Sequence, residues 1–162
     1  MTGFALAGRL NLHATAIIAG EAGILILGPS GAGKSSLALA AIALFRARGR
    51  FAALVADDRV WLSTAGGRLV AEAPEAIAGL VEIRGCGVVP HDHERRALID
   101  RAVRLVGRAD APRMADEAAA EAILGVCLPC LDLAEGEAAA GARALAAWLG
   151  CPGGAVPGHP CP

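Results

Sequence analysis

The segment Gly28–Ser36, GPSGAGKSS, decides the fold of this chain. It follows the apolar run GILIL and precedes SSLALAAIAL, which has helical periodicity, so it indicates a glycine-rich loop between a strand and a helix. In such a loop, backbone N–H groups surround phosphate oxygens, the lysine reaches the β and γ phosphates, and the serine hydroxyl ligates Mg²⁺. A chance match by an ordinary glycine-rich turn is the alternative. We predict binding of ATP with Mg²⁺ by the loop residues Gly28, Pro29, Ser30, Gly31, Ala32, Gly33, Lys34, Ser35 and Ser36.

Lys34 is the only lysine in the chain, because fourteen of the 15 basic residues are arginine. A lysine ammonium is a compact point charge, and the broader guanidinium fork of arginine does not replace it in this role. The one lysine therefore stands where phosphate chemistry requires it, which strengthens the prediction.

Size and composition fit one domain over residues 1–150, followed by a Pro/Gly-rich tail over 151–162 that we expect to be disordered. The net charge of −1 gives no general attraction to nucleic acid or to anionic membranes. We find neither a secretory signal nor a membrane-spanning run, and expect a cytoplasmic protein. The five cysteines give no disulfide framework. Cys127 and Cys130 form a C-x-x-C, for which zinc or redox use is the alternative to two buried core thiols.

The pattern along the chain predicts an α/β fold. Strands are expected over 10–18 and 23–27, a helix after the loop, and a short buried strand in FAALVADD. A hairpin about TAGG follows, then a strand in GLVEI that runs into a glycine-rich bend. Leu98, Ala102 and Leu105 have helical spacing; EAILGVCLPCLDL indicates a late strand and EGEAAAGARALAAWLG a final helix. On the first helix we expect one buried face made of Leu37, Ala40, Ala41 and Leu44.

Asp57 and Asp58 follow the predicted strand FAALVA, at the sheet edge that faces the ligand crevice in open α/β sheets. A carboxylate there could hold Mg²⁺ or accept the proton of an attacking hydroxyl. Consecutive strand residues point to opposite faces, so one role each is favoured over a shared role. A strand-end Asx turn is the alternative.

Three further polar features are less specific. Glu82 and Arg84 lie two residues apart on one strand face, where they could form only a salt bridge. His13 lies on the strand preceding that of the loop, and a lone histidine is usually structural. His91 and His93 lie in PHDHE, where a solvated loop is favoured over a metal site because no third ligand is evident.

Taken together, these residues resemble the catalytic domain of the HPr kinase/phosphorylase family. The resemblance rests on LHATAIIAGEAGILILGPSGAGKSSLALA, LVADDRV and GLVEIRGCGVV, in that order, over residues 10 to 89. The phosphate loop alone is common to many enzymes; the combination of Ala-Asp-Asp with Glu-Ile-Arg-Gly is more specific.

The resemblance implies a P-loop kinase-like α/β core of the HPr kinase/PEP carboxykinase type, with a mixed sheet flanked by helices. It implies a Mg-ATP-dependent kinase that phosphorylates a serine of an HPr-like phosphocarrier protein, and possible homo-oligomers. By position, Asp57 would accept the seryl proton with His13 close to it, and Asp58 would assist. The Mg²⁺ ligands would be Ser35, Glu82 and Asp57, and Arg84 would help to place the phosphate or the neighbouring loop.

The chain departs from the family pattern near its end. The family's Arg-Pro-Gly-Arg-Asn segment is absent, as in the short form similar to alphaproteobacterial members, which speaks against the phosphorylase activity. Arg95, Arg96 or Arg113 are candidates to replace its arginines at the phosphate. Two other functions stay open: a small-molecule P-loop kinase with an arginine-rich lid, and a regulatory module that binds ATP without turnover.

Overall fold

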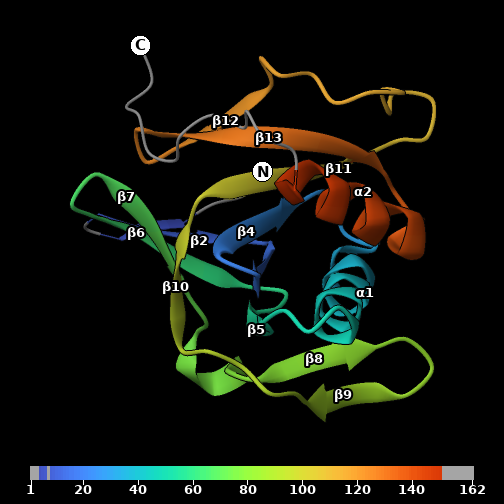
Figure 1. The fold of residues 1–162 in the computed structure, drawn as a ribbon. Helices are drawn as coiled ribbons and strands as arrows, with labels where there is room; N and C mark the ends of the chain where they lie inside the picture. Colours follow the sequence, from blue (N-terminus) through green and yellow to red (C-terminus); the bar gives the residue numbers. More distant parts are fainter. Residues whose placement is uncertain (1–3, 7, 151–162) are drawn as a thin grey trace.

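The computed structural model describes residues 4–6 and 8–150 (Figure 1). The strands before and after the first helix are β1 Phe4–Leu6, β2 Arg9–Leu12, β3 Thr15–Ala19, β4 Ala22–Leu27, β5 Ala52–Ala56, β6 Val60–Ala65 and β7 Arg68–Glu72. The remaining strands are β8 Leu80–Ile83, β9 Gly87–Pro90, β10 Arg96–Ile99, β11 Arg101–Val106, β12 Ala120–Ile123 and β13 Val126–Ala134. The helices are α1 Lys34–Ala47, α2 Ala138–Gly150 and a short 3₁₀ helix Glu75–Ile77.

The central sheet has six strands in the order β12-β13-β11-β4-β3-β5. The strands β4, β11 and β13 run parallel, whereas β3 is antiparallel to both β4 and β5. The strand β4, which leads into the phosphate loop, is central and buried on both faces. This explains its continuous apolar sequence.

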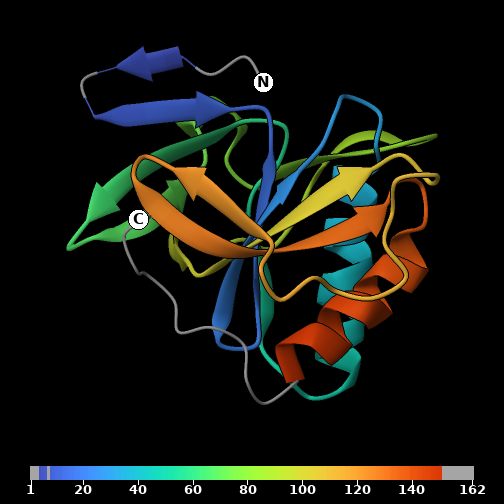
Figure 2. The ribbon, with the colours of Figure 1, turned by 90° about the horizontal axis from the view of Figure 1, so that it is seen from above.

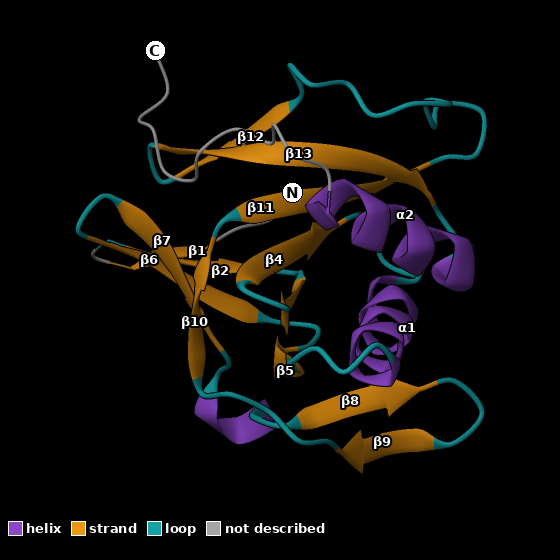
Figure 3. Cartoon of the chain, in the orientation of Figure 1, coloured by secondary structure: helices purple, strands orange, loops and turns teal. Residues whose placement is uncertain are grey.

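The two faces of the central sheet are covered differently (Figures 2 and 3). Ile24 and Ile26 of β4 pack toward α1 and α2, which lie together on one face. Leu25 and Leu27, which alternate with them, pack toward the second sheet. That second sheet is antiparallel with the order β1-β2-β6-β7-β10. The expected mixed α/β fold is confirmed, with helices on one face and a sheet on the other.

The chain changes sheets at His13, so the single strand expected over 10–18 is wrong. The strand β2 belongs to the second sheet and β3 to the central sheet. His13 and Ala14 form the break between them. An apolar pattern alone does not reveal such a crossing, because both strands contribute to the same core layer, β2 with Leu12 and β3 with Ala16.

The helix expected from Leu98, Ala102 and Leu105 is also wrong, because these residues lie on β10 and β11. Leu98 is 41% exposed, so the three do not share a buried face. The strand β11 lies between β4 and β13, and tertiary pairing overrides the local spacing. The late strand expected in EAILGVCLPCLDL is instead the hairpin β12–β13, and its turn contains Leu124 and Gly125.

Other elements are confirmed with small changes. The hairpin β6–β7 turns at Gly66 and Gly67, and GLVEIRGCGVVP forms the small separate hairpin β8–β9 next to α1 (Figure 1). On α1, the fully buried face is centred one residue later than predicted, with Ala40 and Leu44 half-buried. The buried residues of α1 are Lys34, Leu37, Ala38, Ala41, Ile42 and Phe45. The expected disordered tail lies outside the described residues.

Candidate functional site: a phosphate loop facing a histidine–aspartate pair

The phosphate loop leaves β4 at Leu27 and enters α1 at Lys34. Gly31 and Gly33 have φ of +80° and +95°, in the left-handed region that only glycine adopts readily. This backbone brings the amino end of α1, with its unpaired N–H groups and positive dipole end, to the floor of a cavity. The geometry is that of an anion site.

The Lys34 side chain binds the backbone of its own loop. Its Nζ donates hydrogen bonds to the carbonyl oxygens of Gly28 and Pro29, each at 2.9 Å, and the residue is only 6% exposed. Burial lowers the pKa of Lys34, whereas the nearby Asp58 and Asp57 carboxylates act in the opposite direction. A buried cation of this kind favours a phosphate anion as an additional partner.

Asp57 lies at the end of β5, behind the phosphate loop, and is 4% exposed. The Ser35 hydroxyl lies 2.7 and 2.9 Å from its two carboxylate oxygens, and the Thr15 hydroxyl donates to Oδ1 at 2.8 Å. Asp57 is therefore enclosed by two hydroxyl groups, one from the first turn of α1 and one from β3. Its carboxylate is directed at the residue that the loop pattern predicts as a Mg²⁺ ligand.

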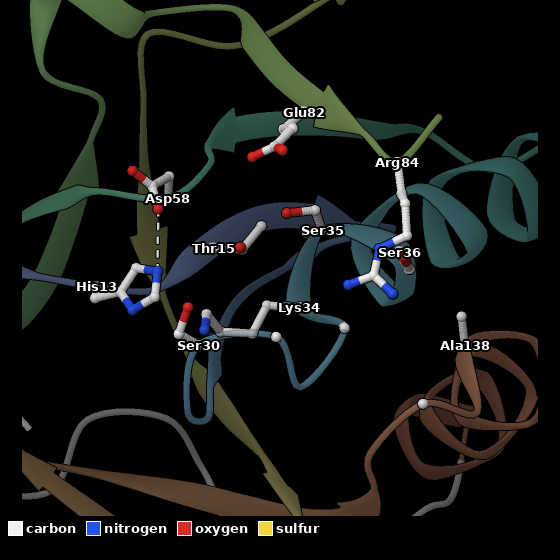
Figure 4. Close-up of a pocket in the computed structure, with 13 residues that line it drawn as sticks. His13, Thr15, Ser30, Lys34, Ser35, Ser36, Asp58, Glu82, Arg84 and Ala138 are labelled. Atoms are coloured by element: carbon white, nitrogen blue, oxygen red, sulfur yellow. Dashed lines mark ion pairs between the residues drawn. The ribbon is translucent and has the colours of Figure 1, made fainter. Parts of the chain in front are cut away.

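Asp58 has the opposite environment. Its φ of +66° lies in the left-handed region, so the chain turns sharply after β5 and its side chain is 70% exposed at the cavity mouth. There Oδ1 lies 3.0 Å from Nε2 of His13 (Figure 4). The resemblance implied that His13 lies beside Asp57; the structure instead pairs it with Asp58. The expectation of opposite faces assumed that strand geometry continues through both aspartates; β5 ends before them and Asp58 has a left-handed backbone, but the two side chains still have different surroundings.

The hairpin β8–β9 supplies the third side of the site. Glu82 and Arg84 line the same cavity, with the Glu82 carboxylate on the side of Ser35 and Arg84 near Ser36 (Figure 4). Within residues 4–6 and 8–150 no ion pair joins Glu82 to Arg84, so the salt-bridge alternative does not describe them. Both side chains are available to a ligand.

These residues surround one open cavity of about 360 Å³. Its walls come from the β2–β3 crossing, the phosphate loop, the end of β5, the hairpin β8–β9 and the β13–α2 junction. The sequence did not predict Gly136 and Ala138 in this wall. Gly136 N–H donates to the carbonyl oxygen of Ala32, which ties the β13–α2 junction to the loop. Thr15 was also missed, although a hydroxyl inside the apolar run ATAII was a signal that could have identified it.

The arginines expected to replace the missing family segment are not in this cavity. Arg95 and Arg96 line a separate hollow beside Trp61, and Arg96 pairs with Glu72 at 3.4 Å. Arg113 is exposed in the β11–β12 connection and does not line the cavity either. Of the arginines considered for the phosphate, Arg84 alone contributes to its wall.

His91, His93, Cys127 and Cys130 belong to no cluster of described residues that could hold a metal ion. Among the described residues, no group of three or more His, Cys, Asp or Glu side chains could hold a metal ion by itself. His91 and His93 lie in the connection after β9, where His91 is half-buried and His93 is exposed and bridges to Leu54 of β5. Cys130 is a buried free thiol, whereas Cys127 is half-buried and is not a free thiol, so the expectation of two buried core thiols holds only for Cys130. In the part of the chain described here, no helix is both long and apolar enough to span a bilayer.

Cys86 and Cys130, the free thiols in the described part of the chain, are expected to differ strongly in reactivity. Cys86 is exposed at the tip of β8–β9, whereas burial raises the pKa of Cys130 to about 12. Because the thiolate is the nucleophile, iodoacetamide at neutral pH should modify Cys86 well before Cys130, as peptide mass spectrometry would record. Equal labelling of both thiols in the folded protein would contradict this environment for Cys130.

Thr15 is expected to stabilise the fold through Asp57. Replacing Thr15 by valine keeps the shape but removes a hydrogen bond to a buried carboxylate, which should lower the free energy of unfolding by about 1.5–3 kcal/mol. The exposed Thr64 of β6 provides the matched control, and Thr64→Val should change little. Denaturant unfolding measures both variants; equal changes would contradict a special role for the buried hydroxyl.

The fold and the loop define this chain as a domain of the P-loop kinase-like class. A family model described as the HPr serine kinase C-terminal domain matches residues 5–93, more than half of the chain. The chain belongs to this family, as the sequence resemblance predicted. The matched region contains every residue discussed above for the phosphate loop, the two aspartates, His13 and the β8–β9 hairpin.

Similar sequences and a solved structure agree with this family assignment. HPr kinase/phosphorylase of Caldicellulosiruptor bescii is 44% identical over 85 residues, and that of Brevibacillus brevis 42% over 85 residues. Each match covers 52% of this chain and 25% of the relative, so the chain corresponds to about a quarter of their length. The solved Hpr(Ser) kinase/phosphatase of Coxiella burnetii superposes with a TM-score of 0.71 at 23% identity, covering 86% of this chain and 95% of that one. This likeness shows the fold.

Proposed function

We propose that this chain is a protein serine kinase that transfers the γ-phosphoryl group of Mg-ATP to a seryl hydroxyl of an HPr-like phosphocarrier protein. One observation carries the proposal: the His13–Asp58 pair faces the mouth of the phosphate loop, while Asp57 lies behind it against Ser35. A site that only holds nucleotide needs the loop and the inner carboxylate. An exposed carboxylate next to a histidine, across from the phosphate, provides in addition a group for an incoming hydroxyl.

The geometry favours exchanging the roles that the resemblance gave to the two aspartates. Asp57 is enclosed by hydroxyl donors and has no open path to an incoming substrate. Asp58 lines the cavity and is exposed. Asp58 is therefore our candidate for the base, with His13 holding its carboxylate in place, and Asp57 orients the metal-binding side of the site.

In the proposed reaction, the Asp58 carboxylate accepts the proton of the seryl hydroxyl. The serine oxygen forms a bond to the γ-phosphorus, the bond from that phosphorus to the β–γ bridging oxygen breaks, and ADP leaves. Lys34 and the N–H groups of the loop stabilise the charge on the phosphate oxygens, and Arg84 lies where it can orient them. Positioning and charge neutralisation thus account for most of the catalysis.

The residues present fit a magnesium ion. Ser35 and Asp57 place two oxygen donors side by side, and the Glu82 carboxylate faces the same cavity. Mg²⁺ commonly takes one or two carboxylates and completes its coordination with substrate phosphates and water. When bound, it would supply charge neutralisation for the β and γ phosphates.

Incubation with labelled ATP and either HPr or a panel of small metabolites tests the proposal. We expect label on HPr and none on the metabolites. Transfer to a metabolite would favour the small-molecule kinase. Tight ATP binding without transfer to any acceptor would favour the regulatory module.

A further inference from the structure

A second cavity, of about 540 Å³, opens beside the first, and the start of the phosphate loop, Gly28, Pro29 and Ser30, forms one of its walls. Its apolar walls come from Leu12, Leu27, Leu105 and Val106, that is, from the ends of β2, β4 and β11. It joins the catalytic cavity at two residues that line both, His13 and Ser30. A side chain placed there would therefore lie beside His13, which pairs with the proposed base.

The polar wall of this cavity carries no uncompensated positive charge. Arg104 makes a two-pronged contact with Asp132, at 2.7 and 3.1 Å, and lies 3.2 Å from Glu121. With two carboxylates around it, its guanidinium gives little attraction to a third anion. The cavity therefore suits an apolar group better than a phosphate or another acid.

The orientation of the bound nucleotide keeps its nucleoside out of the second cavity. The γ-phosphorus must lie beside Asp58 and His13, because the proposed base acts there. Ser36 and Ala138 line the opposite end of the catalytic cavity (Figure 4). The phosphate chain then runs from Asp58 toward Ser36, so the nucleoside extends out of the catalytic cavity at the Ser36 end. The second cavity opens at the other end, which is the side from which an acceptor must approach.

From this arrangement we propose that the second cavity is a specificity subsite for the protein acceptor, which receives a large aliphatic side chain next to the phosphorylated serine. The inference rests on the proposed kinase function. Consecutive Cα atoms are about 3.8 Å apart, so a serine at Asp58 places its neighbours within reach of a cavity that begins at His13. The aliphatic walls, beside an arginine that two carboxylates already pair, select Leu, Ile or Met at that neighbour over an acidic residue.

The test fills the second cavity with a larger side chain and measures the KM for the acceptor and the Kd for the nucleotide separately. Val106 is half-buried at the end of β11, and Val106→Trp would occupy the space; Val106→Asp is a second variant that places a charge there. The control is Leu98→Trp, at an exposed apolar position on β10 that lines neither cavity. We expect both Val106 variants to raise the KM for HPr at least tenfold, with an unchanged Kd for a non-hydrolysable ATP analogue. Leu98→Trp should alter neither value.

The acceptor provides the matching half of the test. Alanine in place of each residue that flanks the HPr serine should, at the position that enters the cavity, raise the KM of the unmodified kinase and remove most of the difference between it and Val106→Trp. A wild-type KM for HPr in both Val106 variants would overturn the subsite, and so would a weakened ATP analogue at unchanged acceptor KM, which would assign the cavity to the nucleoside. Absence of any transfer to HPr by the wild-type protein would instead refute the proposed function, and the subsite with it.

Discussion

Replacing Asp58 by asparagine is expected to lower phosphoryl transfer by about 10²–10⁴-fold, the usual contribution of a positioned general base. Nucleotide affinity should change less than transfer does, because the carboxylate is exposed at the cavity mouth and acts on Lys34 only through its charge. Asparagine keeps the shape of the side chain and can still accept a hydrogen bond from His13, but it does not accept a proton. A phosphoryl-transfer assay stopped at fixed times measures the rate, and titration with an ATP analogue measures the nucleotide affinity.

Asp57→Asn is the control that separates the two aspartates. Asp57 contacts Ser35 and Thr15 and is buried, so its loss of charge should weaken binding of the nucleotide in the presence of Mg²⁺. If Asp57→Asn abolished transfer with intact nucleotide binding while Asp58→Asn transferred normally, the base would be Asp57 after all. The pair of variants thus decides between the role given by the resemblance and the role favoured by the geometry.

Replacing Lys34 by methionine is expected to raise the Kd for ATP at least about 30-fold, because truncating one partner of a hydrogen-bonded charge pair costs about 2–5 kcal/mol. Burial lowers the pKa of Lys34, so in the free protein the ammonium is held at an energetic cost that a bound phosphate offsets. Methionine has nearly the same length and should pack in the same space. Calorimetric titration with ATP measures the loss.

Lys34→Arg is the informative second variant. It keeps the charge, but the broad guanidinium does not fit where Nζ donates to the Gly28 and Pro29 carbonyls. We therefore expect it to restore little of the affinity. Full recovery by arginine would mean that charge alone matters, and the single lysine among fourteen arginines would then have no chemical reason.

The strand–loop–helix unit was predictable because its signals are local. Apolar runs, helical spacing and a fixed glycine–lysine–serine pattern all lie within about one supersecondary unit. The failures were non-local. The crossing at His13 depends on two sheets sharing one core, and β11 is a strand because β4 and β13 lie on either side of it.

The same distinction holds for the site. Residue types and spacing indicated Lys34, Ser35 and the two aspartates, and the resemblance brought in His13, Glu82 and Arg84. Which aspartate meets His13 could not be predicted, since it depends on the left-handed backbone of Asp58 at the end of β5. Gly136 and Ala138 enter the wall only because β13 lies beside β11 and delivers its end to the loop.

The most direct test of the central claim is phosphosite mapping of HPr after incubation with this protein and Mg-ATP. We expect one phosphoryl group on a serine of HPr, formed by the wild-type protein and strongly reduced with Asp58→Asn at saturating ATP. An unmodified HPr in the presence of a protein that binds Mg-ATP, or undiminished phosphoserine with Asp58→Asn, would contradict it.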